Sequence, residues 1–554
     1  MFNDKVREES LKKAISLYES ILEIYRKDNF REKYVEVQNK LGVAYYRLLE
    51  IYNTVEYRNK ALNSLNEASR FYTIDSKKYG EVVSNIGLVL KRTAKTNRKD
   101  LEESIKCFET CDKIFKNNDN YLYGKNLKDL GAAYRKLFEI DSKEIYAEKA
   151  IFYGNRASIV FNINEYPFDF ADCQDNLGIA YRKLSDLKER KTNLEKAIFH
   201  YLQAKNLFID KRPVDYSGTC NNLGIIYSRL GQICNSEENL SKAIELYNEA
   251  INILTKKLYP IQYARFKHNL GLAYRRLAKI KEYEKNINES INNFNDALEF
   301  RTENEFKFSY ANTQCELSLA YIKLSKIKNK LTNLKEAEIR LNESKIILDD
   351  GEHKVDLSEC LSFFGYLYYE FSKINNKKYY IEQGINYVNE SINIRKDGVN
   401  QYQYAINQLQ LGRMYRELSS IEDPIVNLER SNEALNNAMQ IFSNEGCQYY
   451  ISKTNFYKGV TFYQMAENHL DNREDLLSKS LDHYAIALKT IRNGEYPLFC
   501  AKVKFHMANS YAKLDNESAI QKSRELYQEV FAILKKENVE EGCQIVQDKI
   551  KDNK

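Results

Sequence analysis

The chain has 554 residues, of which 43% are hydrophobic and 29% are charged, a balance typical of a folded protein rather than a disordered one. Its net charge of +6 is small for this length, so overall charge alone does not argue for nucleic acid. No apolar run approaches the roughly 18 residues of a membrane helix, and the start MFNDKVREESLKK has no apolar signal core, so we expect a cytoplasmic protein without a membrane partner.

The first expected element is a lone helix within residues 1–29, around LKKAISLYESILEIY, which we interpret as an N-terminal cap. A repeat then runs from residue 30 to 536, and the polar segment 537–554 is expected to be a C-terminal cap or tail. The reference position of the repeat recurs every 44 to 49 residues in eleven units, at Gly42, Gly87, Gly131, Gly178, Gly224, Gly271, Ser318, Gly365, Gly412, Gly459 and Ala508. Such a period, with no Gly/Ser/Pro-rich linker, predicts one continuous solenoid.

Each unit opens with an expected helix, called helix A, that carries an aromatic and leucine stripe. An aromatic residue such as Tyr181, Tyr227 or Tyr274 follows the reference position by three residues. Offsets −8, −1, +3 and +6 share one face at about 100° per residue. Four of the five prolines stand eleven residues before the reference, where proline suits the first turn of a helix: Pro167, Pro213, Pro260 and Pro497.

A second expected helix, called helix B, follows in every unit, as in NLEKAIFHYLQA at 193–204 and NLSKAIELYNEA at 239–250. Small residues two turns apart, such as Ala197 and Ala204, are expected to face the reference glycine and let the two helices pack closely in an antiparallel pair. Asparagines at the expected starts of helix B are predicted to be N-caps: Asn193, Asn239, Asn286, Asn333 and Asn427.

Leu-Gly-x-x-Tyr in helix A, followed by Ala-x-x-x-Tyr and a later Ala in helix B, resembles the tetratricopeptide repeat. The unit is longer than the family's roughly 34 residues, and the family's Trp position holds residues such as Gln38, Gln174 and Cys220. The long units look like arrays of microbial signalling and defence proteins and, more distantly, kinesin light-chain repeats. The resemblance implies an all-α, right-handed superhelical solenoid of about eleven helix-A/helix-B pairs that serves interaction.

Candidate binding residues lie on the face of helix A opposite the core stripe, which in tetratricopeptide arrays lines the concave groove. Offset −2 supplies the asparagines Asn85, Asn176, Asn222 and Asn269. Offset +5 supplies a basic residue in each of the first seven units: Arg47, Arg92, Lys136, Lys183, Arg229, Arg276 and Lys323. Amides can hold an extended peptide backbone, and cations can pair with carboxylates.

The pattern therefore predicts a non-catalytic scaffold or sensor that binds a peptide or partner protein of acidic character, including a separately encoded effector. Two alternatives stay open. The same residues could be solvated helix ends whose asparagines bond a neighbouring helix, or the basic ladder could hold the phosphates of a nucleic acid.

The usual catalytic and cofactor-binding motifs are missing from the sequence. The sequence has no G-x-x-x-x-G-K-[ST] or GxGxxG loop, no HExxH helix and no CxxC pair. Cys107 and Cys111 are one turn apart, but Cys111 falls on a small core position. We therefore expect no enzyme activity, no cofactor, no metal and no disulfide.

Overall fold

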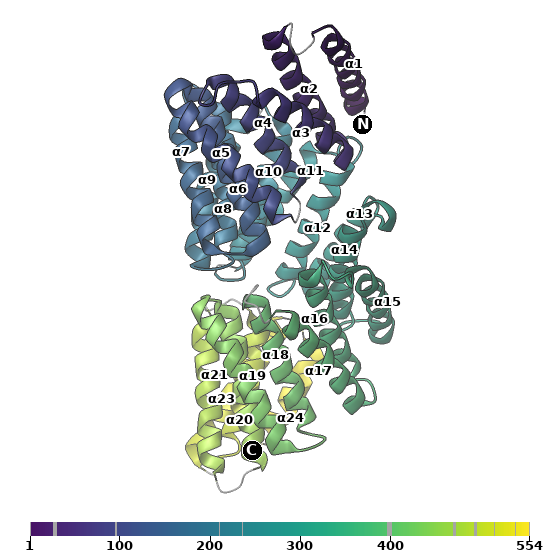
Figure 1. Ribbon diagram of the computed structural model, residues 1–554. Coiled ribbons are helices and arrows are strands. Elements are labelled where there is room, and N and C mark those ends of the chain that lie inside the picture. Colours follow the sequence, from purple (N-terminus) through teal and green to yellow (C-terminus); the bar gives the residue numbers. More distant parts are fainter. Residues whose placement is uncertain are drawn as a thin grey trace. The chain divides into compact units, whose positions relative to one another are not determined.

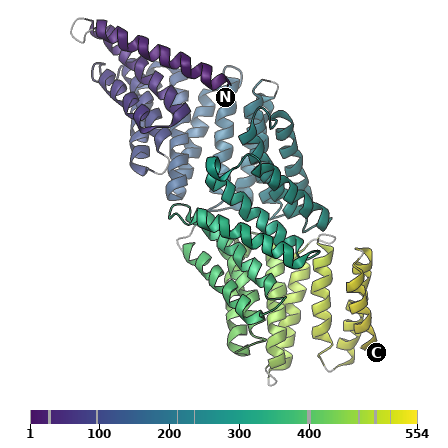
Figure 2. The same ribbon diagram turned by 90° about the vertical axis from the view of Figure 1, so that its right-hand side faces the viewer.

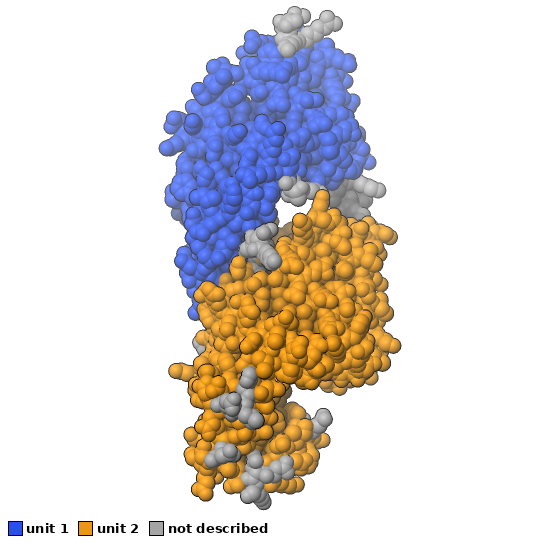
Figure 3. Space-filling view, turned by 60° about the horizontal axis from the view of Figure 1, so that its bottom comes forward, with its two compact units in different colours: residues 1–212 blue, residues 213–554 orange. Residues whose placement is uncertain are grey.

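The computed structural model describes residues 2–25, 30–94, 97–209, 211–234, 236–395, 401–468, 472–491, 496–514, 516–537 and 539–552. These residues form 24 α-helices and no β-strand. None of the helices in these ranges combines the length and apolarity that crossing a membrane requires. The chain divides into two compact units, Met1–Arg212 and Pro213–Lys554, which Figure 3 colours blue and orange.

Unit 1 contains the first nine helices (Figure 1). They are α1 (Phe2–Ile24), α2 (Arg31–Tyr52), α3 (Val55–Ser69), α4 (Lys77–Thr93), α5 (Arg98–Asn118), α6 (Asn120–Asp141), α7 (Glu144–Val160), α8 (Pro167–Leu184) and α9 (Arg190–Phe208).

Unit 2 contains the other fifteen, seen from two sides in Figures 1 and 2. They are α10 (Pro213–Leu230), α11 (Ser236–Ile253), α12 (Pro260–Leu277), α13 (Tyr283–Leu298), α14 (Glu303–Leu324), α15 (Lys330–Leu348), α16 (Lys354–Phe371), α17 (Lys377–Ile394), α18 (Gln401–Leu418), α19 (Pro424–Asn444), α20 (Gln448–Asn468), α21 (Arg473–Thr490), α22 (Pro497–Tyr511), α23 (Glu517–Lys536) and α24 (Glu540–Asp552).

The helices pack in consecutive pairs, from α2 with α3 to α22 with α23, so each expected A and B helix has its partner. Helix α1 packs on α2, and α24 packs on α23. The all-α, paired-helix fold predicted from the sequence is confirmed within each unit. A continuous coil through both units stays a prediction, as do the domain limits drawn from the sequence.

The two helices of a pair approach closely at the reference glycine. A Cβ atom added at Gly224 would lie 2.6 Å from the ring of Tyr247, and one added at Gly271 would lie 2.8 Å from the ring of Phe294. Tyr247 and Phe294 occupy the same position of helix B, four residues after its first small residue, and both rings are buried. Glycine is required here because no side chain fits between the backbone and the aromatic ring.

The small residues of helix B also face helix A, as predicted, and serine adds a hydrogen bond there. The Oγ atoms of Ser104 and Ser431 donate to the carbonyl oxygens of Gly87 and Gly412, each at 2.7 Å. At the second small position of helix B, two turns after the first, Ser344 Oγ donates to the carbonyl oxygen of Ala311 at 3.0 Å. A buried hydroxyl is therefore satisfied by a helical carbonyl, which explains why serine replaces alanine so freely at these positions.

The prediction that the asparagines of helix B are N-caps was wrong. Helix B begins three residues earlier, for example at Arg190 rather than after Asn193. The asparagine side chains instead donate backwards, each at 2.8 Å, to a carbonyl of the preceding turn: Asn193 to Lys188, Asn239 to Cys234, Asn286 to Lys281, Asn333 to Lys328 and Asn427 to Glu422. They fix the A-to-B turn, whose carbonyls would otherwise lack a partner.

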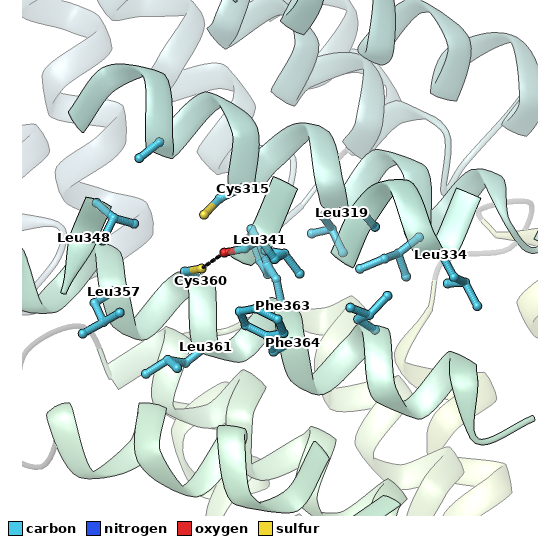
Figure 4. Close-up of a cluster of buried hydrophobic side chains, with 14 of the residues drawn as sticks. Cys315, Leu319, Leu334, Leu341, Leu348, Leu357, Cys360, Leu361, Phe363 and Phe364 are labelled. Atoms are coloured by element: carbon cyan, nitrogen blue, oxygen red, sulfur yellow. Dashed lines mark hydrogen bonds between the residues drawn. The ribbon is translucent and has the colours of Figure 1, made fainter. Parts of the chain in front are cut away.

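A hydrophobic cluster in unit 2 shows how successive repeats join (Figure 4). It combines residues of α14, α15 and α16, including Leu319, Leu341 and Phe364. The Cys360 thiol donates to the carbonyl oxygen of Leu341 at 3.6 Å, so a cysteine acts here as a small core residue. Helix A of one repeat thus packs on both the A and B helices of the repeat before it.

Candidate functional site

A cavity of about 180 Å³ in unit 2 is lined mainly by A helices of the sixth to tenth repeats. We call it the basic cavity. Its residues come from α12, α14, α16, α18 and α20 and from the adjoining turns: Gln232, Arg275, Arg276, Lys279, Glu316, Leu319, Ile322, Lys323, Lys326, Glu359, Phe363, Tyr366, Glu370, Tyr402, Gln403, Ile406, Arg413, Tyr450 and Lys453. Seven of these side chains are basic and three are acidic, so the lining carries an excess of positive charge.

Two of the three carboxylates are already paired. Glu316 forms a short ion pair with Arg275, and both side chains are almost buried. Glu370 lies 3.1 Å from Lys326 and 2.7 Å from Lys373. Burial opposes ionisation of Glu370, but the two lysines outweigh it and lower the pKa of this carboxyl to about 2. The Glu370 carboxylate is therefore charged at neutral pH, and both carboxylates are used by nearby cations of the chain itself.

The third carboxyl, Glu359, contributes less negative charge. Burial and the nearby Glu316 raise its pKa to about 7. Near neutral pH this group is protonated in a large part of the molecules, so the positive excess of the cavity is larger than a count of formal charges suggests.

Five of the seven wall cations form no ion pair with a carboxylate within the described part of the chain. Arg276 and Lys279 have hydrogen bonds instead, and the other three are Lys323, Arg413 and Lys453. The guanidinium carbon of Arg413 lies 4.3 Å from the ring centroid of Tyr369 and 5.1 Å from that of Tyr457. Stacking on two rings holds the guanidinium in place.

The ionisation of neighbouring groups reflects this crowding of cations. Burial, with Lys279 and other cations nearby, places the pKa of Lys323 well below its usual range. Burial also lowers the pKa of Lys453 to about 8. Burial opposes ionisation of Tyr457, yet Arg413, Lys502 and Lys453 outweigh it and lower the pKa of this phenol to about 6. An anion entering the cavity would relieve this repulsion.

Arg276 is held in a defined position at the edge of the basic cavity. Its Nη1 donates to Ser228 Oγ at 2.5 Å. The amide oxygen of Gln232 accepts from Arg276 Nε and Nη2, both at 2.9 Å, while the Gln232 amide nitrogen donates to Tyr402 Oη at 3.1 Å. These contacts satisfy much of the guanidinium, so Arg276 frames the cavity.

The structure places two of the four predicted asparagines in contact with a neighbouring helix. Asn85 Nδ2 lies 3.3 Å from Asn39 Oδ1, and Asn269 Nδ2 lies 2.8 Å from Asn221 Oδ1. Asn176 donates to the carbonyl oxygen of Asp172 in its own helix at 2.9 Å. Asn222 is half-buried on α10. A peptide-binding role for Asn85, Asn176, Asn222 and Asn269 stays a prediction, and two of the four already bond the helix of the preceding repeat.

The predicted basic ladder behaves differently in the two units. In unit 1 its cations contact the preceding repeat or their own helix: Arg47 reaches Glu50 at 3.1 Å, Arg92 the Glu50 carbonyl at 3.0 Å, Lys136 the Lys91 carbonyl at 2.7 Å and Lys183 Glu139 at 3.8 Å. In unit 2, Arg229 is half-buried on α10, while Arg276 and Lys323 line one cavity. The structure therefore brings together two members of the ladder.

Several cations of the basic cavity were missed from the sequence. Lys279 and Lys326 lie in A-to-B turns at offset +8, and Lys373 occupies the same offset in the next repeat. A lysine at one offset in three successive repeats is a signal that could have been found. Arg413 carries no such signal, since it is the only cation at its offset. Lys453 shares its offset with Lys502 of the next repeat, but only the folding of the chain brings Lys453 to the cavity.

The described residues offer no evident catalytic or metal-binding group. They contain no cluster of three His, Cys, Asp or Glu side chains that could hold a metal ion. Burial raises the pKa of Cys107 to about 11 and raises that of Cys111 further, so neither thiol forms a reactive thiolate near neutral pH. What the geometry of the basic cavity can do is bind an anionic group.

No protein-family model matches this sequence, and no curated protein matches it. Solved structures of helical-repeat proteins are similar to it in fold. A monomeric mutant of IFIT1 with Gppp-AAAA is 13% identical, with 90% of this chain and 95% of that chain covered and a TM-score of 0.44. A signal transduction ATPase with a tetratricopeptide repeat sensor from Pyrococcus horikoshii is 14% identical, with 92% and 74% covered and a TM-score of 0.43. The apo quorum sensor NprR from B. thuringiensis is 15% identical, with 69% and 99% covered and a TM-score of 0.41.

The chain is thus similar to tetratricopeptide-repeat proteins, as the Leu-Gly-x-x-Tyr and Ala-x-x-x-Tyr patterns indicate. The likeness concerns the paired-helix fold.

Proposed function

We propose that this chain is a non-catalytic binding module, and that a peptide or partner protein inserts an acidic group into the basic cavity of unit 2. The observation that carries this function is the set of three wall cations, Lys323, Arg413 and Lys453, that have no carboxylate partner in the described residues. The phenolate of Tyr457 is one negative charge beside several buried cations. An incoming carboxylate therefore still recovers part of the free energy that removing these cations from water costs.

The size and walls of the cavity favour a side chain or chain end of a protein partner. A volume of about 180 Å³ admits a group as large as a glutamate side chain or a terminal carboxylate, and not a folded element. Apolar residues such as Leu319, Ile322 and Phe363 stand beside the cations. An extended acidic segment can therefore place its carboxylate on the cations and its apolar atoms on these residues.

A nucleic acid is the second hypothesis, and two observations weigh against it. The ladder cations of unit 1 are used in contacts with neighbouring helices or their own helix, so they do not form a row of unpaired charges. One of the three tyrosine rings that line the cavity is already covered by cations, since Lys279 and Lys453 lie 5.5 and 5.9 Å from the ring centroid of Tyr450. Single-stranded readers need open aromatic faces on which bases stack.

The test compares two triple variants that lose the same charge. Lys323, Arg413 and Lys453 are changed to Gln in one, and Arg47, Arg92 and Lys136 are changed to Gln in the other. The probe is a fluorescein-labelled peptide with a run of glutamates, and its matched control has glutamines instead. Fluorescence anisotropy should show binding of the acidic peptide that weakens about tenfold or more in the cavity variant only.

Equal weakening in both triple variants would contradict the proposal, because it would mean unspecific attraction to positive charge. A single-stranded oligonucleotide that displaces the acidic peptide and binds more tightly would favour the second hypothesis. A photo-crosslinking amino acid placed at Phe363 in native cells then identifies the partner, and a nuclease treatment distinguishes protein from nucleic acid.

A further inference from the structure

A second pocket in unit 2 is separate from the basic cavity and shares no residue with it. It has a volume of about 290 Å³ and lies where α12 and α14 begin. Its wall combines apolar and cationic side chains, chiefly Leu254, Ile261, Arg265, Phe300, Arg301 and Phe306. We call it the arginine pocket.

The two guanidinium groups of this pocket are neighbours without a counter-charge. Neither Arg265 nor Arg301 has an ion pair with a carboxylate among the residues that the structure describes. Burial, together with the positive charge of Arg265, lowers the pKa of Arg301 to about 10. Two arginines that lie close enough to repel one another face the same hollow.

The pairing of other cations on α12 makes this arrangement unusual. Lys267 lies 2.9 Å from Asp296, and Arg275 forms an ion pair with Glu316. Arg265 stands on the same helix as both, two residues before Lys267, and lacks such a partner within the described chain. The chain thus provides carboxylates to its neighbours and none to the arginine of the pocket.

The position of Arg301 is fixed by a polar contact below the pocket. Its Nη1 donates to Thr313 Oγ1 at 2.9 Å, and Thr313 Oγ1 in turn lies 3.1 Å from His268 Nδ1. A guanidinium that is anchored through one nitrogen keeps its other N–H groups in a defined direction. This is the pre-organisation that a binding arginine requires.

An aromatic wall stands beside the two cations because the backbone changes direction at Phe306. This residue has φ −134° and ψ 47°, which interrupts the helical conformation within α14. Tyr259 takes nearly the same conformation, with φ −135° and ψ 59°, directly before Pro260 at the start of α12. An aromatic residue therefore takes this conformation near the start of both α12 and α14. In α14, the A helix of the seventh repeat, that residue is Phe306, which lines the arginine pocket.

We propose that the arginine pocket binds a small organic anion in which an oxyanion head, a carboxylate or a phosphate, is joined to an apolar body. The forked guanidinium groups match the planar pair of oxygens in such a head. Phe300, Phe306 and Ile261 supply the apolar surface for the body. A water molecule occupies about 30 Å³ of liquid water. The pocket volume of about 290 Å³ therefore suits a small ligand of roughly ten water-sized groups.

The test uses three probes of one shape: 3-phenylpropanoate, phenyl phosphate and the neutral 3-phenylpropanamide, titrated into the full-length protein by calorimetry. The anions should bind and the amide should bind about tenfold more weakly or not at all. The tighter of the two anions identifies the head group. Arg265→Gln and Arg301→Gln should each weaken the anions about tenfold, while Arg301→Lys, which keeps the charge and loses the fork, should fall between.

Lys307→Gln is the matched control, because this exposed lysine lies next to Phe306 and does not line the pocket. Its anion affinity should equal that of the wild type. The inference is overturned if the amide binds as tightly as the anions, if the arginine variants bind as the control does, or if neither anion binds at millimolar concentration. Thermal melting of each variant shows that it is folded. The acidic peptide of the basic cavity should bind Arg301→Gln unchanged, so the two proposals stand or fall separately.

Discussion

Lys279 Nζ lies 3.3 Å from the phenol oxygen of Tyr450, a residue 171 positions further along the chain. A second contact of this kind joins Tyr496 Oη to Ser236 Oγ at 2.7 Å across 260 positions. Repeats of a solenoid ordinarily contact their neighbours alone. In unit 2 the sixth and tenth repeats also meet, and this meeting encloses the basic cavity.

Two glycines of one helix should respond in opposite ways to alanine. Gly224→Ala should lower the free energy of unfolding by about 1 to 3 kcal/mol, because its new Cβ would lie 2.6 Å from the Tyr247 ring. Gly218→Ala should raise that free energy by up to about 1 kcal/mol, since beyond its chain neighbours and its own helix backbone no atom lies within 4 Å of the new Cβ, and alanine favours the helix. Urea unfolding followed by circular dichroism checks both. Equal effects of the two substitutions would contradict the close approach at Gly224.

The asparagine that fixes each A-to-B turn should contribute to stability through one hydrogen bond. Asn286→Ala removes the 2.8 Å donation to the Lys281 carbonyl and should cost about 1 kcal/mol. Asn292→Ala is the control, because Asn292 is exposed on the same helix. Hydrogen exchange of the 278–286 turn should accelerate in Asn286→Ala alone. If Asn286 were an N-cap, an aspartate at this position would restore stability, because an N-cap side chain accepts a hydrogen bond. The Asn286 side chain instead donates, which an aspartate cannot do, so we expect Asn286→Asp to stay destabilised.

Tyr457 should titrate far below an ordinary tyrosine. Its pKa is about 6 in the folded protein, against an ordinary value of 10.0, because nearby cations outweigh burial. Near-ultraviolet absorbance should show a tyrosinate forming around pH 6 that is missing in Tyr457→Phe. Tyr366→Phe is the control, since burial raises the pKa of Tyr366 and keeps it neutral there.

The same ionisation links stability to pH. Between about pH 6 and 10 the folded chain has lost the Tyr457 proton that the unfolded chain retains, so the unfolded state binds more protons. The free energy of unfolding should therefore rise with pH across this window. The rise should be smaller in Tyr457→Phe, and an unchanged slope would contradict the assignment.

The wall cations without a carboxylate partner should favour binding of an anion and lower the free energy of unfolding. Lys323→Met removes a desolvated cation that has no carboxylate partner in the described residues, and should raise the free energy of unfolding by about 1 to 3 kcal/mol. Glu370→Gln takes a counter-charge from Lys326 and Lys373 and should lower it by about 3 kcal/mol. Chemical denaturation measures both changes. A destabilised Lys323→Met would show that this lysine is satisfied within the fold.

The sequence by itself determined the all-helical class, the eleven units and the pairing of A with B helices, because these depend on local periodicity and on small residues repeated at fixed spacing. Ser104 and Gly87 illustrate this, since the predicted close approach appears as a 2.7 Å hydrogen bond. The start of helix B could not be read in the same way. Whether Asn286 caps a helix or holds the turn depends on backbone carbonyls whose direction no sequence pattern reveals.

Only the tertiary structure decided which cations of the repeated face can meet a ligand. Arg92 and Lys323 occupy the same offset, yet Arg92 donates to the Glu50 carbonyl while Lys323 lines the basic cavity. A repeat pattern fixes which face of its helix a residue occupies. The contacts that this face makes depend on how repeats far apart in the chain approach, as Lys279 and Tyr450 do, and this arises from the sum of many small packing angles rather than from any single residue.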